Sequence, residues 1–409
     1  MNILLITDQY PPEIRSISYM IQELAEGLVR RGHEVTVVVS YPRHVFLANR
    51  HSTTRPQVDG VKVLRVNTLH YRTSSYLIRG IGELLLPFLF FRKLRKSGPQ
   101  EVDVVIMYSP PLTLTILGRM VKRLYQARFI VNIQDIFPQN AIDLGILRNS
   151  LLIGFFERLE NKAYSSADQI TTHSKQNAEY LINAKNVPRN KVSTVHNWID
   201  LSSYKESKGA GIFLQRYGLE GKFIFLLAGI LGPSQQLNFL IEVAREVRDI
   251  SEICFLIVGE GSAKNEAQNL VVHYGLDNVK FQPFVPKEDY PELVKDVDVG
   301  VACLNSKNKT PVYPGKIVGF MASGIPVVAF LHRESDGHQM IKEAGCGYTT
   351  VSDDHLKAAD LVRKMYYERD RLRGLGEKGF QYATAHFSKE VAIDEMEKLL
   401  LDSERTQVI

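Results

Sequence analysis

Cysteine is scarce in this sequence, and its scarcity excludes several classes of protein. Cys254, Cys303 and Cys346 are the only cysteines in 409 residues, and no two of them form a CxxC pair. The eleven histidines show no metal-ligand spacing either. We therefore expect no disulfide framework and no structural metal, in a chain that works in a reducing compartment.

Long apolar runs and strong charge are also missing. No stretch reaches the roughly 18 uninterrupted apolar residues that a bilayer crossing needs. The chain begins with Met1-Asn2 and runs directly into ILLI, without the basic segment of a secretory signal. Lysine and arginine number 50 against 45 aspartates and glutamates, a net charge of +5, which is too weak to indicate a nucleic-acid partner. We expect a cytoplasmic protein that binds no nucleic acid.

Two nucleotide-binding motifs are absent. The loop after the first predicted strand, TDQYPPEIRSIS at residues 7–18, lacks the G-x-G-x-x-G fingerprint of dinucleotide-binding enzymes, and no P-loop occurs anywhere in the chain. These absences argue against an NAD-dependent dehydrogenase and against a P-loop nucleotidase.

The apolar segments that are present predict two α/β domains. Short β-branched runs alternate with helical periodicity along the first half, which indicates a parallel sheet covered on both faces. The same alternation starts again near Phe223, after a polar stretch at 202–211. We predict doubly wound domains over 1–201 and 212–385 that face each other across a cleft, and a helix with a tail at 386–409 that packs back on the first domain. Open sheets of this kind bind ligands at the carboxyl ends of their strands.

Glycines follow two successive strands of the second domain. Gly229 and Gly232 come after the strand at 223–228, and Gly259 and Gly261 come after the strand at 253–258. Glycine lets the backbone approach a ligand closely, and a helix that begins nearby offers free amides to an anion. Plain glycine-containing turns are the alternative.

A lysine stands at the start of a predicted helix in the segment TPVYPGKIVGFMASGIPVVAF at 310–330. Pro314 and Gly315 suit a helix entrance, which places Lys316 in the first turn. A cation there opposes the helix dipole unless an anion is bound. The pattern therefore predicts a pyrophosphate site, and a solvated surface lysine is the alternative.

The segment YLIRGIGELLLPFLFFRKLRK at 76–96 combines an apolar stretch with adjacent cations. This combination suits docking on an anionic membrane surface. An ordinary buried helix with a basic end is the alternative.

The order of these segments resembles the family 4 glycosyltransferases of the GT-B fold, in the bacterial branch that builds capsule, O-antigen and exopolysaccharide. The resemblance covers almost the whole chain. It rests on YPPE (10–13), ELAEGLVRRGHEVTVV (23–38), SPPL (109–112), QDIFPQNAIDLGIL (134–147), ERLENKAYSSADQITTHS (157–174), VHNWID (195–200), AGILG (228–232), VGEG (258–261), LDNVKFQPFVPKEDYPELVKDVDVGVACL (276–304) and PGKIVGFMASGIPVVA (314–329).

The resemblance implies transfer of a sugar, with retention, from a nucleotide sugar linked to UDP or GDP, without a metal or other cofactor. The acceptor would be a saccharide or a polyprenyl-linked saccharide, and the enzyme would work in the cytoplasm or at the inner face of the plasma membrane. The donor residues implied in the second domain are Gly229, Gly232, Gln236, Gly259, Gly261, Val285, Pro314, Gly315 and Gly319. Those implied on the acceptor side are Arg15, Ser16, Ser109 and Pro110.

Two residues are candidates for a catalytic role. Lys316 would neutralise the leaving diphosphate. Asp135 is a conceivable acceptor-side carboxylate, and a structural helix cap is the alternative.

The sequence departs from the family pattern at three places. Gly319 and Pro311 stand where the family carries two glutamates, the first of which holds the donor ribose. Gln235 and Gln236 replace basic residues, and Arg15–Ser16 replaces a small-residue turn. These departures leave open a nucleotide-sugar epimerase of the same fold and a non-catalytic binding protein derived from it.

Overall fold

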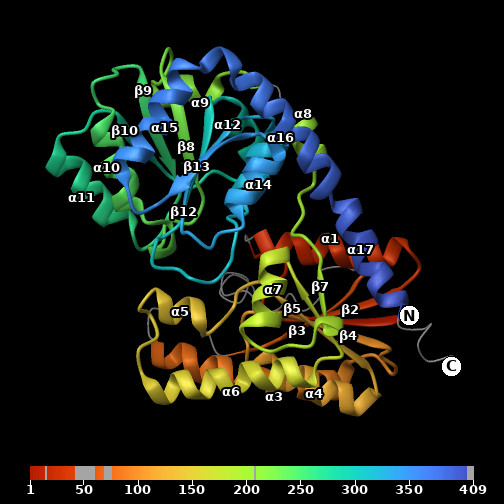
Figure 1. The fold of residues 1–409 in the computed structure, drawn as a ribbon. Helices are drawn as coiled ribbons and strands as arrows, with labels where there is room; N and C mark the ends of the chain where they lie inside the picture. Colours follow the sequence, from red (N-terminus) through yellow and green to blue (C-terminus); the bar gives the residue numbers. More distant parts are fainter. Residues whose placement is uncertain (14–15, 42–59, 69–75, 207–208, 403–409) are drawn as a thin grey trace. The chain divides into compact units, whose positions relative to one another are not determined.

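The chain forms two compact units, each built on a parallel sheet (Figure 1). The computed structural model describes residues 1–13, 16–41, 60–68, 76–206 and 209–402. Unit 1 comprises Met1–Ile142, Leu147–Asn197 and Lys389–Ile409, and unit 2 comprises Asp143–Ile146 and Trp198–Ser388. Two doubly wound α/β sheets confirm the predicted fold class.

Seven parallel strands form the sheet of unit 1, in the order β3-β2-β1-β4-β5-β6-β7. They are β1 (Asn2–Ile6), β2 (Glu34–Ser40), β3 (Lys62–Val66), β4 (Val104–Ser109), β5 (Arg128–Ile133), β6 (Gln169–Thr172) and β7 (Val192–Thr194). Because β1 pairs with both β2 and β4, the strand order reverses there. Sheets of this kind bind ligands beyond the carboxyl ends of the strands at such a reversal.

Helices cover both faces of this sheet, which is why its strands read as continuous apolar runs. On one face lie α3 (Tyr76–Ser97), α4 (Leu114–Tyr125) and α6 (Ser150–Ser166), and on the other lie α1 (Ser16–Arg30) and α7 (Lys175–Asn183) (Figure 1). The short helix α5 (Gln139–Asp143) follows β5. Every residue of the central strand β4 is buried as a result.

The proline of the apolar segment lies inside a helix. Pro87 is in the interior of α3, where its missing N–H removes one helical hydrogen bond. The neighbouring side chains of Leu86, Phe90 and Leu94 are buried in the core under the sheet, and this packing holds the helix together. Among the helices that the structure describes, α3 included, none combines the length and the apolar character needed to cross a bilayer.

Unit 2 repeats the design with six parallel strands in the order β10-β9-β8-β11-β12-β13. The strands are β8 (Phe223–Ala228), β9 (Ile253–Val258), β10 (Val279–Gln282), β11 (Val299–Cys303), β12 (Val327–Leu331) and β13 (Gly347–Val351). The helices are α8 (Ser202–Glu206), α9 (Ile212–Tyr217), α10 (Leu237–Glu246), α11 (Lys264–Tyr274), α12 (Tyr290–Lys295), α13 (Lys316–Ser323), α14 (Gly337–Ala344), α15 (His355–Tyr367) and α16 (Leu372–His386). The helix α8 occupies the first half of the polar stretch at 202–211.

Alternate residues of the central strand β8 enter different cores, as a sheet with two covered faces requires. Ile224 and Leu226 pack with α13, whereas Phe225 and Leu227 pack with α10 and α15. The order of strands reverses between β8 and β11, since β8 pairs with both β9 and β11.

The last helix, α17 (Lys389–Leu401), belongs to unit 1 and packs on α1. The Ile393 side chain occupies the space that a β-carbon at Gly27 would take. Arg31 pairs with the carboxylates of Asp394 and Glu397. The Arg128 guanidinium donates to the carbonyl of Leu399 at 2.8 Å, which satisfies a carbonyl that a helix end leaves without a partner.

Shortening Ile393 should therefore weaken unit 1. Ile393 is 2% exposed, so Ile393→Ala should lower the free energy of unfolding by about 2–5 kcal/mol, because it leaves a cavity between α17 and α1. Leu401→Ala is the matched control, since Leu401 lies on the same helix and is 43% exposed. Denaturant unfolding followed by circular dichroism measures both, and equal effects would show that α17 is not held by this contact.

Candidate functional site

Three loops of unit 2 meet at the carboxyl edge of its sheet, where the strand order reverses. They follow β8, β9 and β11, and the third leads into α13. The backbone N–H of Gly229 donates to the carbonyl of Val258 at 2.9 Å, so the first two loops begin in contact.

Glycine is required where these loops cross. A β-carbon at Gly259, which has a φ of 146°, would collide with the carbonyl oxygen of Gly229. A β-carbon at Gly261 would collide with the carbonyl oxygen of Leu231. The close packing of one loop on the other therefore explains why glycine stands at these two predicted donor positions, and it requires no ligand. Gly229 itself has a φ of 123°, a conformation that side chains rarely adopt.

The Lys316 side chain lies against the first of these glycines. Its Nζ is 3.3 Å from the position that a β-carbon at Gly229 would take, and its Cε is at 3.2 Å. The side chain is half-buried, and no carboxylate among the described residues pairs with it. Loss of hydration lowers the pKa of Lys316 to about 8, against the opposing effect of the neighbouring Cys303 sulfur. A cation in this position gains from an anion that replaces the lost water.

The Gln236 side chain is already engaged within the protein. Its Oε1 accepts from the N–H of Ser306 at 2.8 Å, and its Nε2 donates to the carbonyl of Ser352 at 3.3 Å. Gln236 has a φ of 45°, which costs on the order of 1 kcal/mol outside glycine. Gln236 therefore joins the loop after β8 to the loops after β11 and β13.

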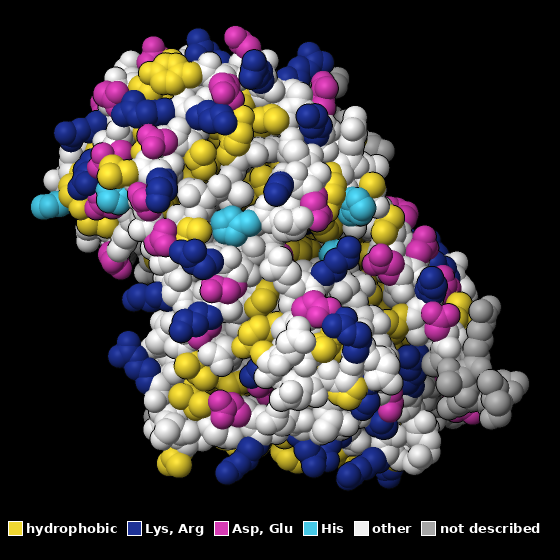
Figure 2. Space-filling model, in the orientation of Figure 1, with side chains coloured by type: hydrophobic (Ala, Val, Ile, Leu, Met, Phe, Trp, Pro, Cys, Tyr) yellow, Lys and Arg dark blue, Asp and Glu magenta, His cyan; other side chains and the backbone are white. Residues whose placement is uncertain are grey.

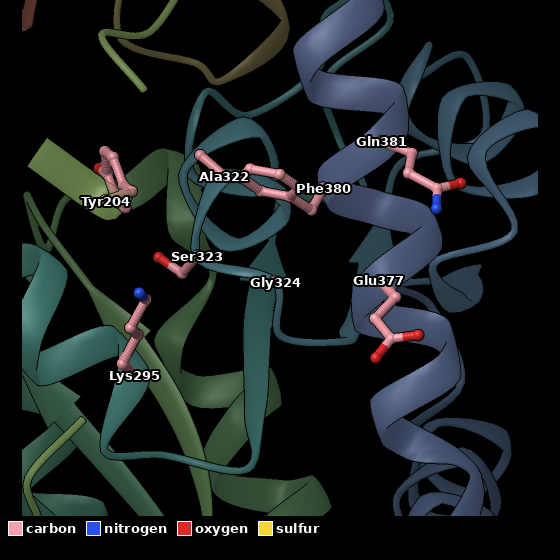
Figure 3. A pocket seen from close by; sticks show the side chains of 8 residues that line it. All are labelled: Tyr204, Lys295, Ala322, Ser323, Gly324, Glu377, Phe380 and Gln381. Carbon is pink, nitrogen blue, oxygen red and sulfur yellow. The ribbon is translucent and has the colours of Figure 1, made fainter. Parts of the chain in front are cut away.

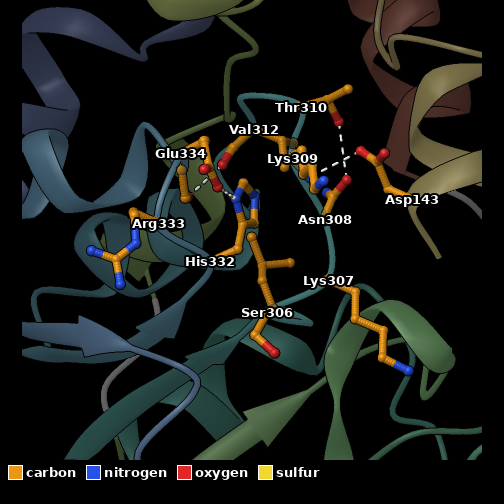
Figure 4. A network of polar contacts seen from close by, with 12 residues as sticks. Asp143, Ser306, Lys307, Asn308, Lys309, Thr310, Val312, His332, Arg333 and Glu334 are labelled. Carbon is orange, nitrogen blue, oxygen red and sulfur yellow. Dashed lines mark hydrogen bonds and ion pairs between the residues drawn. The ribbon is translucent and has the colours of Figure 1, made fainter.

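The loop between β11 and α13 is held by polar contacts within itself and with neighbouring segments of unit 2 (Figure 4). The Ser335 hydroxyl donates to the carbonyl of Val312 at 2.5 Å, and the Thr310 hydroxyl donates to Asn308 at 3.1 Å. At its start, the Asn305 N–H donates to the carbonyl of Ser234 at 2.8 Å. These bonds hold the segment that leads to Lys316 at the start of α13.

The other predicted donor residues lie around the same edge, with different accessibility. The N–H of Gly232 donates to the Gln235 side-chain oxygen at 3.0 Å, and a β-carbon at Gly232 would only be in ordinary contact with that oxygen. Pro314 is half-buried and Gly315 is exposed at the entrance of α13. Val285 is buried in the core of unit 2, while its neighbour Phe284 is 51% exposed. The side chain of Val285 therefore belongs to the core of unit 2.

Gly319 is buried one turn into α13, and two tyrosines face the space it leaves. A β-carbon at Gly319 would stand 3.7 Å from the hydroxyl oxygens of both Tyr204 and Tyr290. Sequence reasoning missed these tyrosines, because they come from α8 and α12, which lie well before Gly319 in the chain.

The carboxyl edge of unit 1 carries a chain of polar side chains. Asn197 donates to Gln134 at 2.8 Å, Gln134 donates to Asn132 at 2.6 Å, and Asn132 donates to the Thr171 hydroxyl at 3.0 Å. The N–H of Gln134 is bonded to the carbonyl of Ser109 at 3.0 Å. An asparagine in the buried strand β5 was the signal in the sequence that could have indicated this network.

The predicted acceptor-side residues lie at this same edge where they are described. Ser109 is buried at the end of β4, and Pro110 is exposed after it. Asp135 is exposed and caps no described helix, since α5 begins only at Gln139. Arg15 lies outside the described residues, as does the side chain of Ser16.

Two hollows lie away from these residues. One, of about 300 Å³, is at the end of α13 opposite to Lys316, and Figure 3 shows Lys295 and Ser323 turned into it while Glu377 points away. The other, of about 450 Å³, is in unit 1 beside Arg128 and Gln169, at the amino edge of the sheet. No predicted site residue lines either one.

Comparison with known proteins covers both units. The profile described as "Glycosyl transferase 4-like domain" matches residues 17–198, and "Glycosyl transferases group 1" matches residues 213–382. The putative colanic acid biosynthesis glycosyl transferase WcaI of Escherichia coli (strain K12) is 24% identical over 334 residues, 79% of this chain and 82% of WcaI.

Two solved structures show the same fold at low sequence identity. Sucrose-phosphate synthase from Thermosynechococcus elongatus has a TM-score of 0.80 and 14% identity, covering 99% of this chain and 100% of its own. HepE of Anabaena, solved in complex with UDP, has a TM-score of 0.72 and 16% identity, covering 98% of this chain and 99% of its own.

The crossing of the loops predicts the effect of a single methyl group. Gly261→Ala should destabilise unit 2 by about 1–3 kcal/mol, because the new β-carbon forces the loop after β8 away from that after β9. Gly374→Ala is the control, since a β-carbon there meets nothing within 4 Å, and it should be neutral or slightly stabilising. Thermal unfolding of the two variants measures the difference, and no loss in Gly261→Ala would disprove the close crossing.

The lowered pKa of Lys316 predicts that anion binding depends on pH. The ammonium is charged below its pKa of about 8 and neutral above it. The affinity for a nucleoside diphosphate, whose phosphates stay ionised over this range, should therefore fall by about tenfold from pH 7 to pH 9. Lys316→Arg should remove this dependence, because the guanidinium keeps its charge. Titration calorimetry measures both proteins, and an equal decline in the variant would assign the effect to another group.

Proposed function

Since the chain belongs to the family 4 glycosyltransferases of the GT-B fold, we propose that it transfers a sugar, with retention, from a nucleotide sugar to a lipid-linked saccharide. In the donor the sugar is linked to UDP or GDP, and the acceptor is a polyprenyl-linked saccharide. The reaction belongs to cell-surface polysaccharide synthesis, and the enzyme works at the inner face of the plasma membrane. The name of WcaI, which refers to colanic acid biosynthesis, supports this setting.

One observation carries the donor half of this proposal. The half-buried ammonium of Lys316 has no carboxylate partner among the described residues, and it lies against Gly229 at the reversal point of the sheet. A diphosphate is the part of a nucleotide sugar that needs such a cation. The N-terminal amides of α13 begin at the same residue and add further donors.

In the proposed reaction, the main task of the protein is to stabilise the leaving group. The bond between the sugar's anomeric carbon and the diphosphate oxygen breaks, a bond to an acceptor hydroxyl oxygen forms, and the proton of that hydroxyl passes to the departing diphosphate. Negative charge grows on the departing diphosphate, so a fixed cation stabilises the transition state more than the ground state. We propose that Lys316 supplies this cation.

The acceptor half rests on unit 1. The polar chain of Asn132, Gln134 and Asn197 is bonded to itself and to the strands, which fixes the edge where a saccharide would lie. Asp135 is exposed there and has no bond to another described side chain. We propose that Asp135 accepts a hydrogen bond from the acceptor.

Removing the Lys316 ammonium should slow transfer while leaving the fold intact. Lys316→Met should lower kcat by about a hundredfold to a thousandfold, the loss expected when one group that stabilises developing negative charge is removed. The thermal midpoint should change little, because the side chain is only half-buried.

The matched control is Lys264→Met. Lys264 is also the first residue of its helix beside a glycine turn, but its ammonium is already bonded to Glu260 at 2.7 Å and to the carbonyl of Gly259. Its removal should cost far less activity. A thermal-shift screen over UDP- and GDP-linked sugars identifies the donor to use in the activity assay, because a bound donor stabilises the protein. If none of them stabilises the protein, or if a sugar is epimerised and released without transfer, the proposal is wrong.

A further inference from the structure

Large apolar side chains lie exposed along one side of α3. Ile81, Leu84, Leu85 and Phe88 are spaced as neighbours on a single helix face, and Phe88 is 55% exposed. The opposite face of the same helix is buried in the core. The exposed row is therefore not the edge of the core but a second apolar surface, which faces away from the sheet.

The helix α6 repeats this arrangement. Leu151, Leu152 and Phe155 are exposed in its first half, Leu151 to 82%. Leu159 and Ala163 of the same helix are buried against the sheet. Scattered exposed leucines are ordinary, but seven large apolar side chains on two helices of one layer are a surface that soluble monomers seldom show.

Cations follow the apolar residues on both helices. On α3 the exposed face continues with Arg92, Arg95 and Lys96, and on α6 it continues with Arg158 and Lys162. None of these five is paired with a carboxylate among the described residues. The acidic residues on the two helices are Glu83, Glu157 and Glu160, of which only Glu157 is exposed. On both helices the exposed face is therefore apolar in its N-terminal half and basic in its C-terminal half.

The topology places the two apolar halves at the same end of unit 1. α4 lies between α3 and α6 and contacts both, and all three share one hydrophobic core. Each of these helices runs back between two parallel strands, so each begins at the carboxyl edge of the sheet. That is the edge where Ser109 and Gln134 lie. Figure 1 shows the three helices along one side of the unit, and Figure 2 shows apolar and basic side chains along the same margin.

We propose that α3 and α6 together form a docking face for an anionic lipid bilayer. The apolar halves enter the boundary between headgroups and acyl chains, and the five cations pair with lipid phosphates. A protein partner would need carboxylates to match these cations, whereas a membrane that contains anionic lipid supplies the complementary charge everywhere on its surface. In this position the carboxyl edge of the sheet lies next to the headgroups.

This inference deepens the proposed function and rests on it for one point, that the acceptor is attached to lipid. It adds α6 to the surface, and it explains why the exposed apolar residues gather at the acceptor edge. The docking itself needs neither donor nor acceptor, so it is measured separately from sugar transfer.

The test is sedimentation of the full chain with vesicles of phosphatidylcholine and phosphatidylglycerol in a two-to-one ratio. The protein should bind these vesicles and should be released by salt. The double variant Leu151→Ser/Phe155→Ser should bind about tenfold more weakly or worse, because the apolar contact of α6 is lost. Arg92→Ser/Arg95→Ser should bind more weakly by a similar factor and should respond less to salt.

Val272→Ser is the matched control, because Val272 is 80% exposed on α11 of unit 2, and its binding should equal that of the unchanged protein. Circular dichroism shows that each variant is folded. The proposal is overturned if the unchanged protein stays in the supernatant, or if the α6 variant binds as well as the control. It is also overturned if the same substitutions abolish a concentration-dependent dimer without affecting sedimentation.

Transfer to a water-soluble saccharide separates this proposal from the proposed function. The α6 variant should keep that activity, since its substitutions change neither the donor residues of unit 2 nor the proposed acceptor residues of unit 1. Transfer without vesicle binding would leave the function standing and remove the docking face. Vesicle binding without transfer to any acceptor would leave the docking face standing and contradict the proposed function.

Discussion

The backbone of the loop after β9 passes so close to the loop after β8 that there is no room for a side chain at the crossing. Gly259 sits against the carbonyl of Gly229, and Gly261 sits against the carbonyl of Leu231. This contact brings two loops of the sheet edge into one layer, and Lys316 rests on it from the start of α13. Any larger residue at the crossing would push the loops apart and move the lysine away from the backbone amides.

A lysine in this setting is costly without an anion. Its half-buried position removes water from the ammonium and lowers its pKa, and the helix that it begins presents a positive end. Neither effect stabilises the empty protein, and both favour a bound phosphate. Gln236 also lies at this edge in an unfavourable, left-handed backbone conformation. Its two side-chain hydrogen bonds offset the free-energy cost of that conformation and connect three loops.

Much of this edge could be predicted from the sequence, because the signals are local. Apolar runs locate the strands, glycines directly after β8 and β9 locate the turns, and Pro314–Gly315 locates the start of α13 one residue later. The prediction of the fold class was correct for the same reason. The assignment of roles to individual residues rests on the resemblance and stays a prediction.

What the sequence could not give are contacts between distant residues. The side chain of Gln236, a predicted donor residue, is bonded to Ser306 and Ser352, which are 70 and 116 residues further along the chain. The contacts of Tyr204 and Tyr290 beside Gly319 are also contacts between residues that are distant in the sequence. The apolar face of α6 was also missed, because its periodicity alone does not tell which of its leucines face the sheet and which face outward.

The central claim is that the lysine at the start of α13 holds the diphosphate of the donor, and a crystal structure with a bound nucleoside diphosphate tests it most directly. We expect a phosphate oxygen within hydrogen-bonding distance of the Lys316 Nζ, beside the backbone of Gly229. A diphosphate bound elsewhere, out of contact with this ammonium, would contradict the account.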